Sequence, residues 1–220
     1  MGIAFDRMSV MVWDEMAASY DRVARKYERR FLDELERKPR DREILTAFAA
    51  STENPIVDIG CGPGHVGEFV RERGRTVLGI DLSVEMVALA AVRLDCVVAA
   101  DMRSLPLASD RIGGLLAFYS LIHIRRTELD AVLHEFKRVL RPGGRLLFSA
   151  HEGDGEITRD EFLDEPVGFV ATLFQLGELV DRTEDAGLAV TMTERRSHYE
   201  GESETVRLYV EATKPTRRSR

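Results

Sequence analysis

The fold is decided by residues 57–67, which read Val57-Asp58-Ile59-Gly60-Cys61-Gly62-Pro63-Gly64-His65-Val66-Gly67. The apolar start predicts a short buried strand, the glycines predict a sharp turn, and the residues after them begin an amphipathic helix. Glycine lets the backbone turn tightly and lets a ligand lie against it without a Cβ in the way. A strand, a glycine-rich turn and a helix in this order therefore predict a ligand that packs on the turn.

Outward from this turn, short β-branched runs alternate with amphipathic stretches, which is typical of βα units around a parallel sheet. Strands are expected at residues 56–59, 76–80, 96–99, 115–119 and 145–150, and helices at residues 65–73, 84–91 and 127–140. Residues 189–198 and 205–212 lie too close for a crossover helix, so they should form an antiparallel hairpin. The sequence therefore predicts an α/β, Rossmann-like, seven-stranded and mostly parallel sheet with helices on both faces.

Four segments complete the predicted organisation. Residues 1–52 carry helical stretches at 11–27 and 41–50 before the first strand, so they are expected to form a lid or flank. Residues 53–214 are expected to form the ligand-binding core, in which the irregular segment 151–173 lines or caps a substrate pocket. Residues 215–220 make a basic tail, which favours a frayed and solvated end.

The composition of the 220-residue chain restricts the cellular compartment and the binding partners that we expect for the protein. A formal net charge of -7 makes nucleic acid a poor partner. No apolar run approaches the ~20 residues that span a bilayer, and the first residues lack the apolar region of a secretory signal. The two cysteines make neither a disulfide framework nor a zinc set. We expect a cytoplasmic protein with no membrane partner and no metal; the sequence does not indicate its oligomeric state.

The glycine turn alone does not choose between two cofactors. Gly62, Gly64 and Gly67 satisfy the dinucleotide pattern G-x-G-x-x-G, whereas Gly60, Gly62 and Gly64 follow another pattern. Asp58 stands at the end of the strand, where it would repel the pyrophosphate of NAD. The same carboxylate would attract the ammonium and sulfonium of S-adenosylmethionine.

Acids also follow the next two predicted strands. Asp81 ends the second strand, where a carboxylate can accept two hydrogen bonds from the ribose of either cofactor. Asp101 and Met102 follow the third strand and would suit an adenine amino group and ring face. Three acids at three successive strand ends favour S-adenosylmethionine.

On these residues the chain resembles the class I S-adenosylmethionine-dependent methyltransferases of the small-molecule type, over residues 54–214. The stretch 140–146, Leu-Arg-Pro-Gly-Gly-Arg-Leu, is similar to the element before the family's fifth strand. The resemblance implies transfer of a methyl group from S-adenosylmethionine to an oxygen, nitrogen or carbon atom of a small molecule, with release of S-adenosylhomocysteine. It also implies a cofactor-binding set, namely Tyr20, Asp58, Gly60, Cys61, Gly62, Gly64, Asp81, Leu82, Met86, Asp101, Met102, Phe118 and Tyr119.

Two histidines are candidates for a general base. His123 follows the fourth predicted strand and His151 the fifth, so both lie at the carboxyl edge of the sheet, where ligands bind in open α/β folds. The alternative for each is a packed or hydrogen-bonded histidine without a catalytic role. For Tyr20 the alternative is simple packing, because Trp13, Tyr20 and Tyr27 repeat at helical spacing.

Two other functions remain open from the sequence. An NAD(P)-dependent oxidoreductase is supported by the dinucleotide glycine pattern, but Asp58, the closing hairpin and the lack of a Tyr-x-x-x-Lys pair count against it. A non-catalytic module that binds S-adenosylmethionine is equally compatible with the motifs. The family's Asn-Pro-Pro-Tyr-like tetrapeptide is missing at 118–121, Phe-Tyr-Ser-Leu, which favours a metabolite over a nucleic acid or a protein glutamine.

Overall fold

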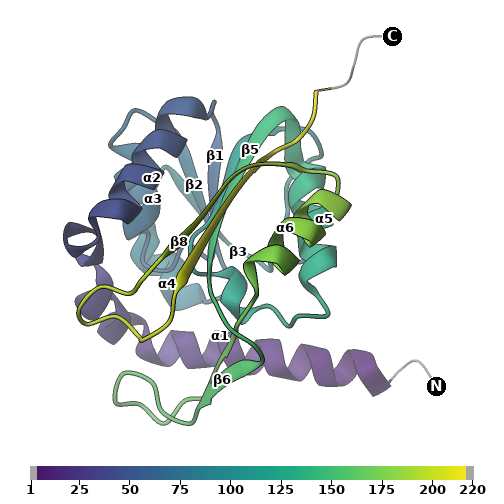
Figure 1. The fold of residues 1–220 in the computed structure, drawn as a ribbon. Coiled ribbons are helices and arrows are strands. Elements are labelled where there is room, and N and C mark those ends of the chain that lie inside the picture. The colour runs from purple at the N-terminus through teal and green to yellow at the C-terminus, as the bar shows by residue number, and fades with distance from the viewer. Residues whose placement is uncertain (1–3, 217–220) are drawn as a thin grey trace.

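A seven-stranded sheet runs through the centre of the molecule in the order β3-β2-β1-β4-β5-β9-β8 (Figure 1). The computed structural model describes residues 4–216, with side chains from residue 15 onward, so residues 1–3 and residues 217–220 of the predicted tail at 215–220 lie outside the description. The strands are β1 (Ile56–Ile59), β2 (Val77–Asp81), β3 (Cys96–Ala99), β4 (Ile112–Ala117), β5 (Leu140–His151), β8 (Ala189–Arg196) and β9 (Arg207–Thr213). The predicted seven-stranded, mostly parallel sheet is confirmed.

The first five strands of the sheet are parallel, and β1 and β4 form its buried centre. Every residue of these two strands is buried, which agrees with their apolar sequences because a parallel sheet carries helices on both faces. The predicted closing hairpin is also confirmed. Strand β9 lies between β5 and β8 and runs antiparallel to both.

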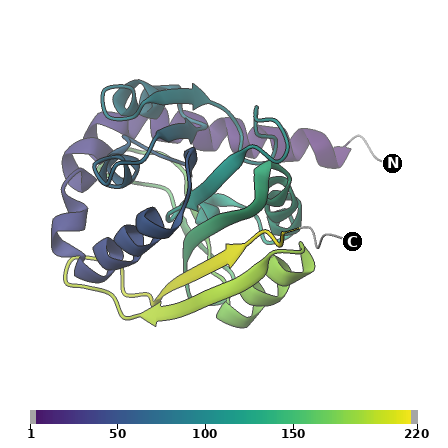
Figure 2. The ribbon, with the colours of Figure 1, turned by 90° about the horizontal axis from the view of Figure 1, so that it is seen from above.

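Helices cover both faces of the sheet, as the view from above shows (Figure 2). They are α2 (Pro39–Ser51), α3 (His65–Arg71), α4 (Val84–Ala90), α5 (Leu129–Val139) and α6 (Leu176–Asp185). Successive residues of β1 point to opposite faces, so Ile56 packs with Phe48 of α2, whereas Val57 packs with Phe136 of α5. The core is thus two apolar layers with the sheet between them.

A long helix, α1 (Ala4–Phe31), crosses the molecule below the sheet in Figure 1 and is followed by the 3-10 turn η1 (Glu34–Arg37). It contains the helix predicted at residues 11–27 and extends beyond it at both ends. Asp21 accepts a hydrogen bond from the Ser83 hydroxyl (2.5 Å), and Glu28 pairs with Arg93 (2.7 Å). These contacts hold α1 on the α4 side of the molecule. Within residues 4–216, no helix combines the length and the apolarity needed to cross a membrane.

The structure differs from the sequence analysis in three places. Residues 156–159 and 169–172 form a separate two-stranded ribbon, β6 (Glu156–Arg159) and β7 (Phe169–Thr172), where the sequence indicated only irregular structure. Helix α6 was missed, although Leu176, Leu179 and Val180 recur at the i, i+3, i+4 spacing of an amphipathic helix. Residues 140–144, which separate the predicted helix at 127–140 from the predicted strand at 145–150, already belong to β5: Leu140 pairs with Ile112, and the register then shifts to Gly114 and Arg145.

The predicted strand at 115–119 also ends earlier, since β4 stops at Ala117. Tyr119 has a φ of 56°, in the left-handed region that a strand residue does not adopt. The chain therefore turns away from the sheet at Phe118, and the two aromatic side chains leave the strand at its carboxyl end. This turn brings residues 118–123 to the candidate site.

A substitution at Gly113 tests the close approach of β4 to the residues that precede β1. A Cβ at this position would lie 1.9 Å from the Glu53 carbonyl oxygen, so we expect Gly113→Ala to lower the free energy of unfolding by at least the ~1–3 kcal/mol typical of overpacking. Gly177→Ala in α6 is the control: nothing lies within 4 Å of its Cβ, and the change should be neutral or slightly stabilising. Urea denaturation measures the free energy of unfolding of both variants. An equal decrease in the two variants would contradict the close packing at Gly113.

Candidate functional site

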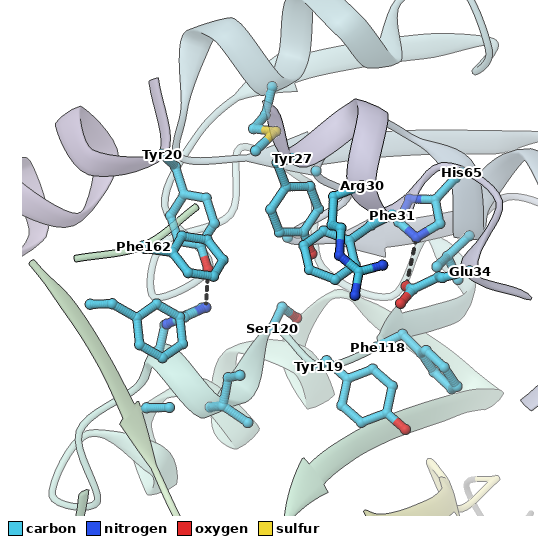
Figure 3. A pocket seen from close by; sticks show the side chains of 18 of the residues that line it. Tyr20, Tyr27, Arg30, Phe31, Glu34, His65, Phe118, Tyr119, Ser120 and Phe162 are labelled. Atoms are coloured by element: carbon cyan, nitrogen blue, oxygen red, sulfur yellow. Dashed lines mark hydrogen bonds and ion pairs between the residues drawn. The ribbon is translucent and has the colours of Figure 1, made fainter. Parts of the chain in front are cut away.

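A cavity of about 430 Å³ opens at the carboxyl ends of β1, β2 and β4, the edge at which the sequence placed the ligand. Its walls come from segments far apart in the chain: α1, η1, the turn after β1, the ends of β2 and β4, the β6–β7 ribbon and residues 199–207. Figure 3 shows the aromatic side chains of α1 and of the β4 end facing the same space. Except for Gly64 and Asp101, all of the predicted site residues line this cavity.

The glycine turn forms the floor beside β1. Gly60 has a φ of 68° and lies so close to Ser120 that a Cβ on it would be 2.3 Å from the Ser120 Cβ. Gly62, with a φ of 54°, has open space on the cavity side, where a Cβ would meet only Tyr27, at 3.9 Å. Gly64 does not line the cavity; it precedes α3 and packs against Ala90. The turn thus presents bare backbone to a ligand at Gly62.

Two buried carboxylates flank this turn. Asp81 accepts hydrogen bonds from the amides of Gly62 (2.8 Å) and Ser83 (2.9 Å), and burial raises its pKa. Asp58 is 2% exposed; burial and, after it, the charge of Asp81 raise its pKa to about 7, although the Gly67 amide opposes the shift. Neither acid forms an ion pair with a residue in the described part of the chain. A positively charged ligand would relieve this unmatched charge.

The remaining predicted residues at this end divide into two groups. Leu82, Met86 and Met102 line the cavity beside Asp81. The Asp101 carboxylate lies outside it and is held by the Arg103 guanidinium at 2.6 Å. Cys61 also lines the cavity, and burial raises the pKa of its thiol well above the usual value, which keeps the thiol protonated.

Tyr20 and His123 meet across the cavity (Figure 3). The Tyr20 hydroxyl lies 2.8 Å from His123 Nε2, and His123 Nδ1 lies 3.0 Å from the Val170 carbonyl oxygen. A carbonyl only accepts, so Nδ1 carries the proton and Nε2 accepts from Tyr20. Burial lowers the pKa of His123 to about 4, and the ring is therefore neutral at physiological pH.

His151 lies on another wall. Its ring stacks on Tyr119 at 5.5 Å, and its Nδ1 lies 2.8 Å from the Thr205 hydroxyl. Burial, followed by the nearby Arg207, lowers the pKa of His151 to about 3, so this ring is neutral too. The Tyr119 hydroxyl lies 2.9 Å from that of Tyr209, which ties this wall to β9.

Aromatic rings that the sequence analysis missed form the wall between α1 and the ribbon. Phe31 packs on Tyr27 at 4.5 Å between ring centres, and Phe162 stacks on Phe169 at 5.0 Å. Phe169 also meets the His123 ring, at 5.5 Å. Helical spacing from Tyr20 and Tyr27 could have indicated Phe31, but no local pattern marks the two phenylalanines of the ribbon region.

Two acids near η1 are fully engaged by the protein. Glu34 lies 2.6 Å from Lys38 and 2.9 Å from His65; burial opposes its ionisation, but these partners outweigh it and lower its pKa to about 2. Glu202 pairs with Arg196 at 2.9 Å and with Lys38 at 3.1 Å. These ion pairs tie η1 to the start of α3 and to the loop between β8 and β9. Among the described residues, no group of three His, Cys, Asp or Glu side chains is placed to hold a metal ion.

Comparison with known proteins identifies the fold. The family described as "Methyltransferase domain" matches residues 56–144. The structure of 1,6-didemethyltoxoflavin-N1-methyltransferase from Burkholderia thailandensis, solved with S-adenosylhomocysteine, superposes with a TM-score of 0.72 at 21% identity, covering 95% of this chain and 90% of that one. At this identity the likeness shows the fold.

Curated relatives share more of the sequence. Malonyl-[acyl-carrier protein] O-methyltransferase from Enterobacter lignolyticus is 33% identical over 141 residues, 63% of this chain and 54% of the relative. An uncharacterised methyltransferase from Geobacillus kaustophilus is 27% identical over 141 residues, 63% of this chain and 64% of the relative. The chain thus matches between about half and two thirds of the length of these relatives. Residues 56–144 thus match a methyltransferase domain, and the relatives and the solved structures support the class I S-adenosylmethionine-dependent methyltransferase family, with S-adenosylmethionine as the cofactor.

Proposed function

We propose that the protein transfers the methyl group of S-adenosylmethionine to an oxygen, nitrogen or carbon atom of a small molecule. The observation that carries this proposal is the division of one cavity into two ends: an acidic end at Asp58 and Asp81, and an aromatic end at His123 and Phe169. The acidic end suits a cationic nucleoside. The aromatic end supplies a second set of walls that a module binding only the cofactor would not need.

The residues of the acidic end fit the adenosine part of the cofactor. Asp81 retains lone pairs beyond those used by the two amides and would accept the ribose hydroxyls. Leu82, Met86 and Met102 would enclose the adenine ring. Asp58, with one carboxylate oxygen lacking a hydrogen-bond partner, would favour the ammonium group by its charge.

Asp81 and Asp101 should contribute unequally to this binding. We expect Asp81→Ala to weaken S-adenosylhomocysteine binding about tenfold to a hundredfold, because it removes a charged acceptor worth ~1.5–3 kcal/mol. Asp101→Ala should have a much smaller effect, because Arg103 already occupies that carboxylate. Calorimetry on both variants measures the difference, and the larger loss in Asp101→Ala would show that adenine binding reorganises the Arg103 pair.

The methionine part of the cofactor carries a carboxylate, for which Arg30 provides a cation. Arg30 lies one turn after Tyr27 on α1, lines the cavity, and packs on the Phe31 ring at 5.6 Å. Tyr27 in turn lies next to Gly62. No ion pair holds Arg30 in the described structure, whereas the neighbouring Lys38 is bound by Glu34 and Glu202. We assign Arg30 to the cofactor carboxylate.

This assignment is tested with a cofactor fragment. We expect Arg30→Ala to weaken binding of S-adenosylhomocysteine about tenfold, the loss of one charge-assisted hydrogen-bond pair, while leaving 5′-methylthioadenosine, which lacks the amino-acid part, unaffected. Arg29→Ala is the matched control, since Arg29 is the adjacent exposed residue and does not line the cavity. Equal weakening of both ligands by Arg30→Ala would contradict the role.

When bound, the cofactor supplies a methyl group activated by its sulfonium: the acceptor atom bonds to the methyl carbon as the carbon–sulfur bond breaks, and the electron pair stays on sulfur. The chain contributes chiefly by positioning and by excluding water, which can supply roughly 7–11 kcal/mol. The phenylalanines of the ribbon region and the tyrosines of α1 form a wall of low polarity for this step. A general base adds ~10²–10⁴-fold where the acceptor must lose a proton.

His123 is the better placed of the two histidines for that role. Its Nδ1 proton is fixed on the Val170 carbonyl, so Nε2 is the atom that can take a proton, and Tyr20 covers it in this structure. An acceptor hydroxyl or amine would replace Tyr20 at Nε2. His151 has one ring nitrogen engaged by Thr205 and would act, if at all, through the other.

The proteins to which the chain is similar are named for substrates of different size. One relative is named for an acyl-carrier protein substrate and one neighbour for a small heterocycle. The aromatic walls support a small molecule, and the sequence lacks the tetrapeptide expected for nucleic acid or protein glutamine. The rival NAD(P)-dependent reaction is disfavoured by the acidic end.

A fractionated cell extract tests the substrate class. We expect S-adenosylhomocysteine to form from S-adenosylmethionine when the protein receives the fraction that passes a small-molecule filter, and not when it receives the protein or nucleic-acid fractions. Asp81→Ala is the control for adventitious hydrolysis of the cofactor. Product formation with only a macromolecular fraction would reject the small-molecule proposal while keeping the methyl transfer.

A further inference from the structure

The β6–β7 ribbon turns one of its faces to the cavity. Ile157 pairs with Ala171 and Arg159 pairs with Phe169 in its antiparallel register, and all four side chains line the cavity. Residues two apart on a strand share a face, which explains why both pairs point the same way. This face is apolar except for one residue, Arg159.

Arg159 is exposed and lines the cavity. No ion pair joins it to a residue in the described part of the chain, and two other acids that line the cavity are used elsewhere: Glu34 by Lys38 and His65, and Glu202 by Arg196 and Lys38. The exposed Glu200, which also lines the cavity, forms no ion pair or side-chain hydrogen bond among the described residues. The guanidinium therefore has free donors toward the cavity side of the ribbon.

The place of the ribbon is fixed by α1 and by His123. Lys26 donates to the Leu163 carbonyl (3.2 Å) and pairs with Glu165 (2.8 Å). Phe169, the cross-strand neighbour of Arg159, packs against the His123 ring, and the Val170 carbonyl accepts from it. Arg159 thus stands on the same wall as the candidate base.

We propose that the methyl acceptor is an anion with an apolar, planar body, whose carboxylate or phosphate group is bound by Arg159 and whose body packs on Phe162 and Phe169. The inference rests on the proposed function, which assigns the acidic end to the cofactor. The guanidinium group of an arginine can donate two parallel hydrogen bonds to either a carboxylate or a phosphate. The stacked pair, 5.0 Å and 27° apart, offers a flat apolar surface beside it. Because the whole chain carries -7, a specific cation is needed to hold an anion here.

The test uses three probes with one ring system: 1-naphthoate, 1-naphthyl phosphate and the neutral 1-naphthalenemethanol. Each is titrated by calorimetry into the full chain saturated with S-adenosylhomocysteine, so that the cofactor end is filled. We expect at least one anion to bind about tenfold or more tightly than the alcohol, as a charge-assisted pair provides. Tighter binding of the naphthoate assigns a carboxylate, and tighter binding of the phosphate ester assigns a phosphate.

Variants separate recognition from a general effect of charge. Arg159→Ala should remove the preference for the anion, Arg159→Lys should keep part of it, and Arg29→Ala, the exposed control, should keep all of it. Phe162→Ala should weaken all three probes together. The proposal is overturned if the alcohol binds as tightly as the anions, if none of the probes binds, or if Arg159→Ala and Arg29→Ala act alike. Failure of the wild-type chain to bind S-adenosylhomocysteine would instead reject the proposed function.

Discussion

The burial of two carboxylates beside a glycine turn is the constraint on which the rest of the site depends. Asp58 and Asp81 lie at the ends of adjacent strands, and removing both from water raises the pKa of each. The Gly62 amide offsets part of this cost by donating to Asp81, which also fixes the turn against β2. This turn requires glycines whose φ angles are positive, and it leaves no room for a side chain at Gly60. A site built this way holds unmatched negative charge in readiness for a cationic ligand.

Helix α1 converts this open edge into a cavity. Along its length, Tyr20 contacts His123 after the end of β4, and Asp21 contacts Ser83 before α4. Lys26 contacts Glu165 in the loop between β6 and β7. Three separate parts of the core are therefore joined through one helix. This arrangement supports the predicted lid role of residues 1–52, which stays a prediction, and it makes α1 a common wall of the two ends of the cavity.

The sequence predicted the parts of the molecule that depend on local pattern. Strands such as Ile56–Ile59 and Cys96–Ala99 were located at their observed bounds, because a β-branched run between turn signals identifies a strand without tertiary information. The glycine turn and Asp81 were located for the same reason. The short strands of the ribbon carried no such signal, because they are held mainly by contacts with distant segments. Helix α6 did carry a helical pattern, which the sequence analysis overlooked.

The candidate site shows the same division. Tyr20, His123 and His151 could be nominated from their positions relative to predicted strands, but the Tyr20–His123 contact joins residues 103 apart in the chain and needed the structure. Arg30, Arg159 and Phe162 became candidates only when the fold showed which cavity they line. For Asp101, the sequence predicted the position after β3 but not the ion pair with Arg103, two residues away.

The most direct measurement is a calorimetric titration of the unmodified protein with S-adenosylmethionine, S-adenosylhomocysteine and NADH. The account predicts that the first two bind at one site per chain and compete with each other, whereas NADH does not bind, because its pyrophosphate would face Asp58 and Asp81. Binding of NADH without binding of the other two would contradict the account and would favour an oxidoreductase.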